Sequence, residues 1–124
     1  MSVILVVEDH PMNRLLVRDV LEHRGHEVVE ARNVDEAARA LAARVPDLVL
    51  LDIQIPGGGG EAVLRSIREH PELATLPVVA VTAFAMAGDR ARLLAAGFDG
   101  YVSKPIDTRA FGPTVEAFIR GEHR

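Results

Sequence analysis

Polar and apolar residues alternate along the chain in a pattern that repeats five times. Each repeat begins with a short strand-like run, and most of these runs have the continuous apolar character of strands buried on both faces of a parallel sheet. A segment with apolar residues three and four positions apart then follows, which predicts an amphipathic helix. The predicted strands are residues 3–7, 26–31, 47–52, 76–82 and 100–103. The predicted helices are residues 11–24, 33–44, 60–70, 88–96 and 107–120.

Local signals place several helix ends. Pro11 suits the first turn of a helix, where its missing N–H is not needed, and Gly25 ends that helix. Asn33 and Glu36 have the spacing of a capping box, and Asp107 can cap the last helix. The apolar positions that recur at helical spacing in the first helix are Leu15, Leu16, Val20 and Leu21.

The repeating strand and helix order predicts the fold. Alternation of this kind implies a parallel sheet with helices on both faces, because each crossover between parallel strands must pass over a face. Five strands in a chain of 124 residues favour a flavodoxin-like (βα)5 doubly wound fold with strand order 2-1-3-4-5. We expect residues 1–124 to form one domain.

Composition and charge narrow the class of protein. The net charge of −4 argues against nucleic acid as the main partner, because phosphate binding needs clustered lysine and arginine. The absence of cysteine excludes disulfides and thiolate metal sites. No apolar run reaches the roughly 20 residues that span a membrane, and the first residues lack the basic start of a signal peptide. We therefore expect a cytoplasmic domain without membrane contact.

Chemically active side chains stand where the predicted strands end. Glu8 and Asp9 follow the first strand, Asp52 ends the third, Thr82 ends the fourth and Lys104 follows the fifth. Ligands bind outside the carboxyl ends of strands in open parallel sheets. Three carboxylates brought close together need a compensating cation. Because the candidate ligands are all oxygens, Mg²⁺ suits them better than zinc does.

Each of these residues also has a simpler explanation. An acid at a strand end often caps the next turn, and Thr82 would then be a turn hydroxyl. Lys104 is the only lysine among 14 basic residues, which is explained either by a need for a compact ammonium or by chance in an arginine-rich chain. Five such residues at one edge by coincidence are far less expected than any single one. The set therefore favours one joint site.

The chain resembles, over nearly its full length, the receiver domains of two-component response regulators, the CheY-like superfamily. The segments that carry the resemblance are ILVVEDHPMNR, LVLLDIQIPGGGGEAV, VVAVTAF and YVSKPI. Thr82 lies 30 residues after Asp52 and Lys104 lies 52 residues after it, spacings that fit the family. The segment PVVAVTAFAMAGDR is most similar to the DivK type of single-domain cell-division regulators. Departures are Ile55, where many members have methionine, and a run of four glycines.

The resemblance implies a role for each site residue. Asp52 would accept a phosphoryl group from a phosphohistidine on a histidine kinase or histidine phosphotransferase. Lys104 would supply a cation to the phosphoryl oxygens. The ligands of Mg²⁺ would be Glu8, Asp9, Asp52 and the backbone carbonyl of Gln54. The chain would then be a phosphoacceptor signalling protein and not an enzyme with a separate substrate.

The resemblance also implies a switch. Thr82 would bind the phosphoryl group, and Tyr101 would change between exposed and buried rotamers; the simpler alternative packs Tyr101 on the last helix. A cis Lys104–Pro105 bond would direct the ammonium inward. Phe84 and Gln54 would slow the loss of phosphate, because an aromatic hinders the attacking water and an amide is no base.

Output would pass through residues 84–120 to a downstream protein target, with the chain a monomer or weak dimer. Two alternatives stay open. The chain could be a receiver module from a hybrid histidine kinase or larger regulator, since such receivers carry close versions of these segments. A flavin-binding flavodoxin shares the fold, but only 4% of the residues are aromatic. His23 and His26, on either side of Gly25, are interpreted as solvated turn residues.

Overall fold

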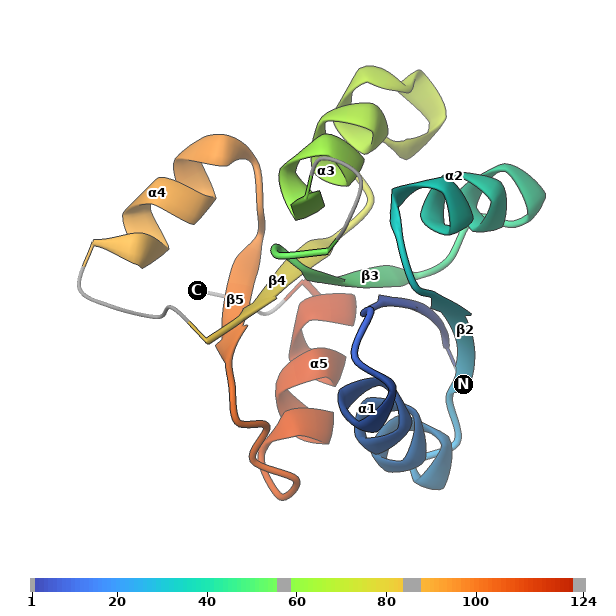
Figure 1. The fold of residues 1–124 in the computed structure, drawn as a ribbon, viewed down its shortest axis with the longest axis vertical. Helices are drawn as coiled ribbons and strands as arrows, with labels where there is room; N and C mark the ends of the chain where they lie inside the picture. The colour runs from blue at the N-terminus through green and yellow to red at the C-terminus, as the bar shows by residue number, and fades with distance from the viewer. Residues whose placement is uncertain (1, 56–58, 84–87, 122–124) are drawn as a thin grey trace.

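The sheet has five parallel strands in the order β2-β1-β3-β4-β5 (Figure 1). This arrangement comes from a computed structural model that describes residues 2–55, 59–83 and 88–121. The strands are β1 (Val3–Val7), β2 (Glu27–Ala31), β3 (Leu48–Asp52), β4 (Val78–Thr82) and β5 (Gly100–Ser103). The predicted flavodoxin-like fold and strand order are confirmed.

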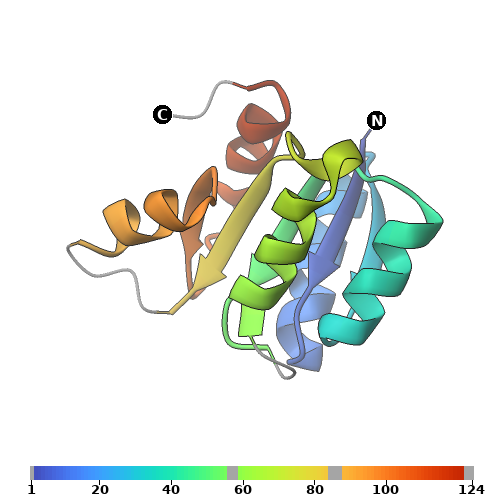
Figure 2. The ribbon, with the colours of Figure 1, turned by 90° about the horizontal axis from the view of Figure 1, so that it is seen from above.

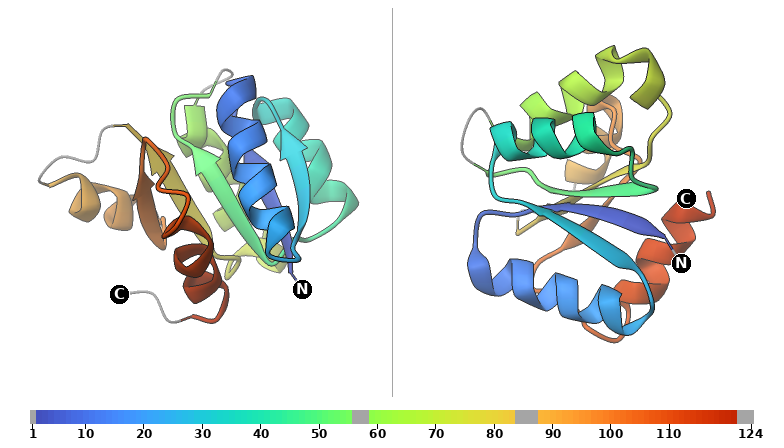
Figure 3. Two further views of the ribbon diagram at one scale, coloured as in Figure 1. Left: turned by 90° about the horizontal axis from the view of Figure 1, so that it is seen from below. Right: turned by 90° about the vertical axis from the view of Figure 1, so that its right-hand side faces the viewer.

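Helices cover both faces of the sheet (Figures 2 and 3). The helices are α1 (Pro11–His23), α2 (Val34–Ala43), α3 (Gly59–Glu69), α4 (Asp89–Ala96) and α5 (Phe111–Ile119), with a short 3-10 turn, η1 (Pro71–Leu73), after α3. The α1 and α5 helices lie on one face, and α2, α3 and α4 lie on the other. Right-handed crossovers between parallel strands produce this double winding.

Two apolar clusters, one on each face, hold the layers together. The cluster under α1 and α5 contains Ile4, Val17, Leu21, Val79 and Phe111, among other buried residues. The cluster under α2, α3 and α4 is formed by the alternate strand positions. Strands β3 and β4 are buried along their whole length, so their continuous apolar runs reflect contact with both helical layers. The sheet is therefore a rigid support for the side chains that follow the carboxyl ends of its strands.

The predicted inward face of α1 is partly wrong. Its buried residues are Val17 and Leu21, whereas Leu15 is 49% exposed. Two residues correspond to a rotation of about 200° about the helix axis, so Leu15 and Val17 lie on nearly opposite sides of α1. A helix that buries Val17 therefore exposes Leu15. The last helix also begins later than predicted, at Phe111. Asp107 Oδ1 accepts from the backbone of Arg109 (3.0 Å), so it caps the turn that precedes α5.

His26 is not the solvated turn residue that the sequence indicated. Its Nε2 lies 2.8 Å from Glu116 Oε2, and its side chain is only 9% exposed. The guanidinium of Arg24 binds the same carboxylate, with 2.7 Å between Nη2 and Oε1. Glu116 belongs to α5 and Arg24 follows α1, so this cluster ties the two helices together at the end of the sheet opposite the predicted site. His23 is exposed, as expected.

Arg68 fixes the C-terminal end of α4. Its Nη2 donates to the carbonyl oxygen of Gly97 (2.8 Å) and to Asp99 Oδ2 (3.0 Å). Its Nη1 donates to the carbonyl oxygen of Leu76 (2.7 Å), in the segment that leads into β4. One side chain of α3 thus joins the end of α4 to the starts of β4 and β5. At the other end, α4 begins after Gly88, which has a left-handed backbone and no capping side chain.

Candidate functional site

The strand register brings the predicted site residues to one edge of the sheet. Val7 pairs with Leu51, Asp52 pairs with Val81, and Thr82 pairs with Ser103. Each chain segment therefore leaves the sheet at nearly the same level. Glu8, Asp52 and Thr82 are only 3%, 4% and 1% exposed. Asp9, by contrast, is exposed to solvent.

Lys104 lies between two of the carboxylates. Its Nζ is 3.0 Å from Glu8 Oε1 and 3.1 Å from Asp52 Oδ2. Its backbone N–H donates to the carbonyl oxygen of Thr82 (2.8 Å), which continues the β4–β5 ladder by one residue. The Lys104–Pro105 peptide bond is cis. The single lysine of the chain thus contacts acids from two other strands.

Burial and charge act in opposite directions on these groups. Burial raises the pKa of Glu8 above its usual value, and the nearby Asp52 carboxylate raises it further, against the opposing effect of Lys104. For Lys104, burial acts to lower the pKa, but the contacts with Glu8 and Asp52 outweigh it and the pKa is raised. The ammonium therefore stays charged in the site.

Every polar atom of Glu8 has a partner. The backbone N–H donates to the carbonyl oxygen of Ala31 on β2 (2.9 Å), and the Glu8 carbonyl oxygen accepts from Arg14 Nη1 (2.9 Å). The carboxylate receives the backbone N–H of His10 on Oε2 (3.2 Å), while Lys104 contacts its other oxygen. Glu8 thus has four partners, as a buried charge requires.

Asp52 is oriented by the loop that follows it. Its Oδ1 accepts from the backbone N–H of Gln54 (3.0 Å), and Gln54 itself is exposed. The start of α3 lies directly against this loop, because Gly60 N donates to the carbonyl oxygen of Ile53 (3.0 Å). A Cβ on Gly60 would lie 2.6 Å from Ile53 Cα and 2.9 Å from the Asp52 carbonyl oxygen. Only glycine allows this approach.

The donor set suits a hard dication. Carboxylate oxygens of Glu8, Asp9 and Asp52 all lie within 4.8 Å of one another. Oxygen ligands of this kind are those that Mg²⁺ prefers. Lys104 contacts two of the three acids, whereas Asp9 has no hydrogen bond or ion pair to any described residue. The fourth predicted ligand, the Gln54 carbonyl, belongs to the residue that holds Asp52, and its role as a ligand stays a prediction.

The residues predicted to form the switch lie beside the site. Thr82 is buried at the end of β4, next to Lys104 along the sheet edge. Tyr101 is partly buried against the apolar cluster under α2, α3 and α4. The alternative that packs Tyr101 on the last helix is therefore wrong, because α5 covers the opposite face. Phe84 and Pro56 lie outside the described residues.

Sequence reasoning missed Arg14. Its guanidinium reaches back from the first turn of α1 to the carbonyl oxygen of Glu8, and its side chain is only 17% exposed. The signal in the sequence is weak, because an arginine near a helix start usually faces solvent. Its position six residues after Glu8, on the helix that begins at Pro11, is the only indication.

A doubly wound parallel sheet with a group of acids and a lysine at its carboxyl edge defines a class of small α/β domains with a charged site at that edge. Comparison with known proteins narrows this class. Residues 4–116 match the model of the response regulator receiver domain family. The chain is 40% identical over 116 residues to the polar-differentiation response regulator DivK of Brucella anthropi, with 94% of both chains covered. It belongs to the response regulator receiver domain family.

Solved structures agree with this assignment. The receiver domain of a signal transduction histidine kinase from Syntrophus aciditrophicus superposes with a TM-score of 0.87 at 31% identity, covering 98% of this chain and 92% of that one. The receiver domain of a sensor histidine kinase from Pseudomonas aeruginosa gives a TM-score of 0.86 at 29% identity, covering 96% and 98%. That structure has a magnesium ion coordinated in its active-site cleft.

Family membership confirms the receiver interpretation and decides against the flavodoxin alternative. The chain is the receiver domain of a two-component response regulator, a class of signalling domain that interacts with histidine kinases and with downstream targets. In the described part of the chain, no helix combines the length and the apolar character that crossing a bilayer would need.

Proposed function

We propose that Asp52 accepts a phosphoryl group from a phosphohistidine on a histidine kinase or histidine phosphotransferase. The observation that supports this most directly is the setting of its carboxylate. It is buried at the edge of the sheet, 3.1 Å from the Lys104 ammonium, with oxygens of Glu8 and Asp9 within 4.8 Å. A rigid strand behind Asp52 keeps the acceptor in place.

In the transfer, an Asp52 oxygen forms a bond to phosphorus while the bond between phosphorus and the imidazole nitrogen breaks. The electron pair of the broken bond stays on the imidazole nitrogen, and because the other ring nitrogen of the phosphohistidine carries a proton, the leaving group is a neutral imidazole. Negative charge is spread over three equatorial oxygens in the transition state, so positioning and cations provide most of the rate enhancement. Lys104 is the cation of this chain for that charge, and the Gln54 N–H keeps the carboxylate oriented.

The residues that would hold Mg²⁺ are Glu8, Asp9 and Asp52, together with the Gln54 carbonyl. When bound, the ion neutralises charge on the acceptor carboxylate and the phosphoryl oxygens. Three carboxylates with one ammonium leave the described site negative, which favours a dication. Exposed Asp9 supports the same proposal, since it has no described partner to give up.

Phosphorylation would act by shifting the population of two conformations. Thr82 is buried at the end of β4, and Tyr101 packs against the apolar cluster that contains Leu93, the only residue that α4 buries. A helix held by so few buried residues requires little free energy to move. Its neighbour Leu94 is 39% exposed, which supports a protein contact on the face formed by α4, β5 and α5. A downstream protein would recognise that face.

The experiment is labelling with acetyl phosphate in the presence of Mg²⁺, followed by mass spectrometry. Wild type should gain one phosphoryl group, and Asp52→Asn should gain none. The matched control is Asp47→Asn, which makes the same charge change just before β3, at the opposite end of that strand, where Asp47 Oδ2 accepts from Val3 N (2.7 Å). Persistent labelling of Asp52→Asn on another residue would overturn the assignment.

A second candidate setting is a receiver module within a hybrid histidine kinase. The similarity to the Syntrophus aciditrophicus kinase receiver favours it, whereas the DivK relative favours a single-domain regulator. Both settings use the same acceptor chemistry. The length of the complete open reading frame distinguishes them, because a hybrid kinase requires a kinase region in the same chain.

A further inference from the structure

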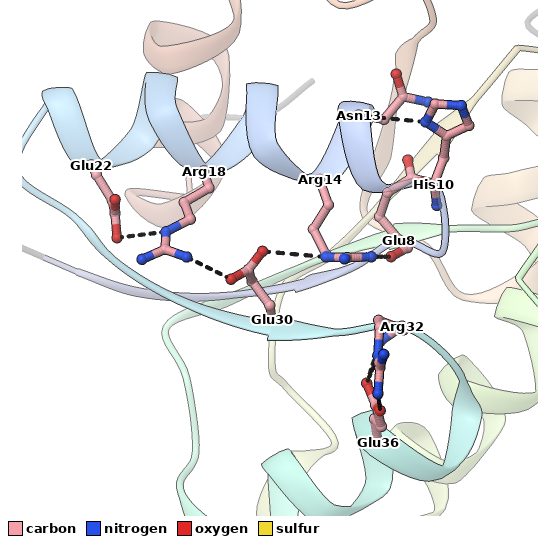
Figure 4. Close-up of polar contacts among 9 residues, drawn as sticks. All are labelled: Glu8, His10, Asn13, Arg14, Arg18, Glu22, Glu30, Arg32 and Glu36. Carbon is pink, nitrogen blue, oxygen red and sulfur yellow. Dashed lines mark hydrogen bonds and ion pairs between the residues drawn. The ribbon is translucent and has the colours of Figure 1, made fainter.

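A row of alternating charges runs from the site along α1 and the edge strand β2 (Figure 4). Arg18 contacts Glu22 (3.2 Å, Nε to Oε2) and Glu30 (2.9 Å, Nη1 to Oε2). Glu30 also pairs with Arg14, with 3.3 Å between Oε1 and Nε. Arg14 ends the row, because its Nη1 donates to the carbonyl oxygen of Glu8 (2.9 Å). The two arginines share one acid, but only Arg14 reaches the site.

The bond to Glu8 fixes more than one atom. A peptide unit is planar, so holding the Glu8 carbonyl oxygen also sets the direction of the Asp9 N–H and constrains the Asp9 Cα. Asp9 has no hydrogen bond or ion pair to another described residue, and its side chain is exposed. Its position therefore depends on its backbone, and Arg14 is the side chain that holds the peptide unit preceding it.

We propose that Arg14 is a positioning residue for the Mg²⁺ site, acting through the Glu8–Asp9 peptide while Glu30 neutralises its charge. The inference rests on the proposed function, since it takes Glu8 and Asp9 as ligands. Arginine suits this role because its planar guanidinium donates in two directions at once, here to a carbonyl and to a carboxylate. A lysine presents all of its donors from one nitrogen, whereas Arg14 contacts its two partners through two different nitrogens, Nε and Nη1.

Positioning and simple electrostatics predict opposite changes in Mg²⁺ affinity when Arg14 is replaced by alanine. Arg14 is a cation near a site for another cation, so deleting its charge would tighten Mg²⁺ binding if charge alone mattered. If positioning dominates, deleting it loosens binding. Losing a partner that orients a metal ligand typically costs about 10-fold or more in metal affinity. The sign of the change therefore decides between the two explanations.

The experiment is a titration of the full chain with Mg²⁺ at constant ionic strength, in which binding is monitored through the backbone amide chemical shifts. Arg14→Ala should weaken Mg²⁺ binding about 10-fold. Arg14→Lys keeps the charge and should still bind several-fold more weakly than wild type. The matched control is Arg18→Ala, which removes the other guanidinium on Glu30 and should bind within about 2-fold of wild type. The same spectra report whether each variant is folded.

Arg14→Ala binding Mg²⁺ as tightly as Arg18→Ala, or more tightly, would overturn the inference. Wild-type affinity in Arg14→Lys would do so as well, and that variant decides the matter if Arg14→Ala does not fold. Failure of the proposed function would look different. In that case, wild type itself would take up no Mg²⁺ near Glu8 and Asp9, and the inference would fall with it.

Discussion

Gly60→Ala tests how closely α3 must approach the acceptor strand. The new Cβ would lie 2.6 Å from Ile53 Cα and 2.9 Å from the Asp52 carbonyl oxygen, both of them backbone atoms. Carbon atoms in contact are separated by about 3.5–4.0 Å, so either the start of α3 or the backbone of residues 52–53 must move by roughly 1 Å. Overpacking of this kind costs about 1–3 kcal/mol of the free energy of unfolding.

The larger effect is expected on phosphorylation. The displaced segment carries Asp52 and the Gln54 N–H that orients it, and a misplacement of about 1 Å at a reacting group costs up to about 100-fold in rate. Urea unfolding gives the stability, and the rate of labelling by acetyl phosphate with Mg²⁺ gives the activity. We expect both the stability and the labelling rate to fall. The rate should fall by much more than the loss of folded protein explains.

The control is Gly25→Ala. Gly25 has a φ of 89°, so alanine there costs about 1–2 kcal/mol in backbone strain, but nothing lies within 4 Å of the added Cβ. The two variants should lose similar stability, and only Gly60→Ala should lose phosphorylation rate. Equal labelling rates in the two variants would refute the argument that the α3 start positions the acceptor.

Two further predictions concern charged groups, and a third concerns Phe84, which lies outside the described residues. Lys104→Met removes one of the two groups that lower the pKa of Glu8, the other being the backbone N–H of His10. Stability should fall by about 3 kcal/mol at pH 7 and recover as the pH drops and Glu8 protonates, or as Mg²⁺ is added. Urea unfolding at several pH values checks this, and a pH-independent loss would contradict it. The guanidinium of Arg24 and the His26 ring lower the pKa of Glu116 from 4.5 to about 2, so its contribution is complete above about pH 4.5 and lost toward pH 2. Glu116→Gln should therefore cost about 1 kcal/mol at pH 7 and nothing near pH 2, and a constant difference from wild type would count against the pairing. Phe84→Ala should shorten the half-life of the phosphorylated protein, measured by loss of label after the donor is removed. An unchanged half-life would show that Phe84 does not slow the hydrolysis of the phosphate.

The fold was largely predictable because its signals are local. Continuous apolar runs such as 48–51 are typical of strands buried on both faces, and the alternation with helices leaves few topologies. Capping was predictable only in part. Asn33 Oδ1 accepts from Glu36 N (2.8 Å), but the Glu36 carboxylate binds the backbone of Arg32 and not that of Asn33. The Glu36 carboxylate can reach the backbone N–H of either Arg32 or Asn33, because the two are adjacent in the chain. The sequence therefore does not decide which of the two it binds.

Convergence of Glu8, Asp52 and Lys104 was predictable because the carboxyl ends of parallel strands meet at one edge. Contacts between distant segments were not. His26 and Glu116 are 90 residues apart, and no periodicity in either segment indicates the other. Arg14 was missed for a related reason, because helical pattern analysis treats a charged residue as solvent-facing and says nothing of a side chain that turns back toward the preceding strand.

Arg68 sets the end about which the proposed movement of α4 would turn. Since this side chain binds Gly97 and Asp99 while the opposite end of α4 begins at an uncapped glycine, a rotation of α4 would have its fixed point at the C-terminal end. Eight residues of helix are about 12 Å long, so a tilt of about 10° displaces the Asp89 end by roughly 2 Å and leaves Ala96 almost in place. A protein that reads the conformation of this domain would discriminate best by touching the half of α4 nearest Asp89.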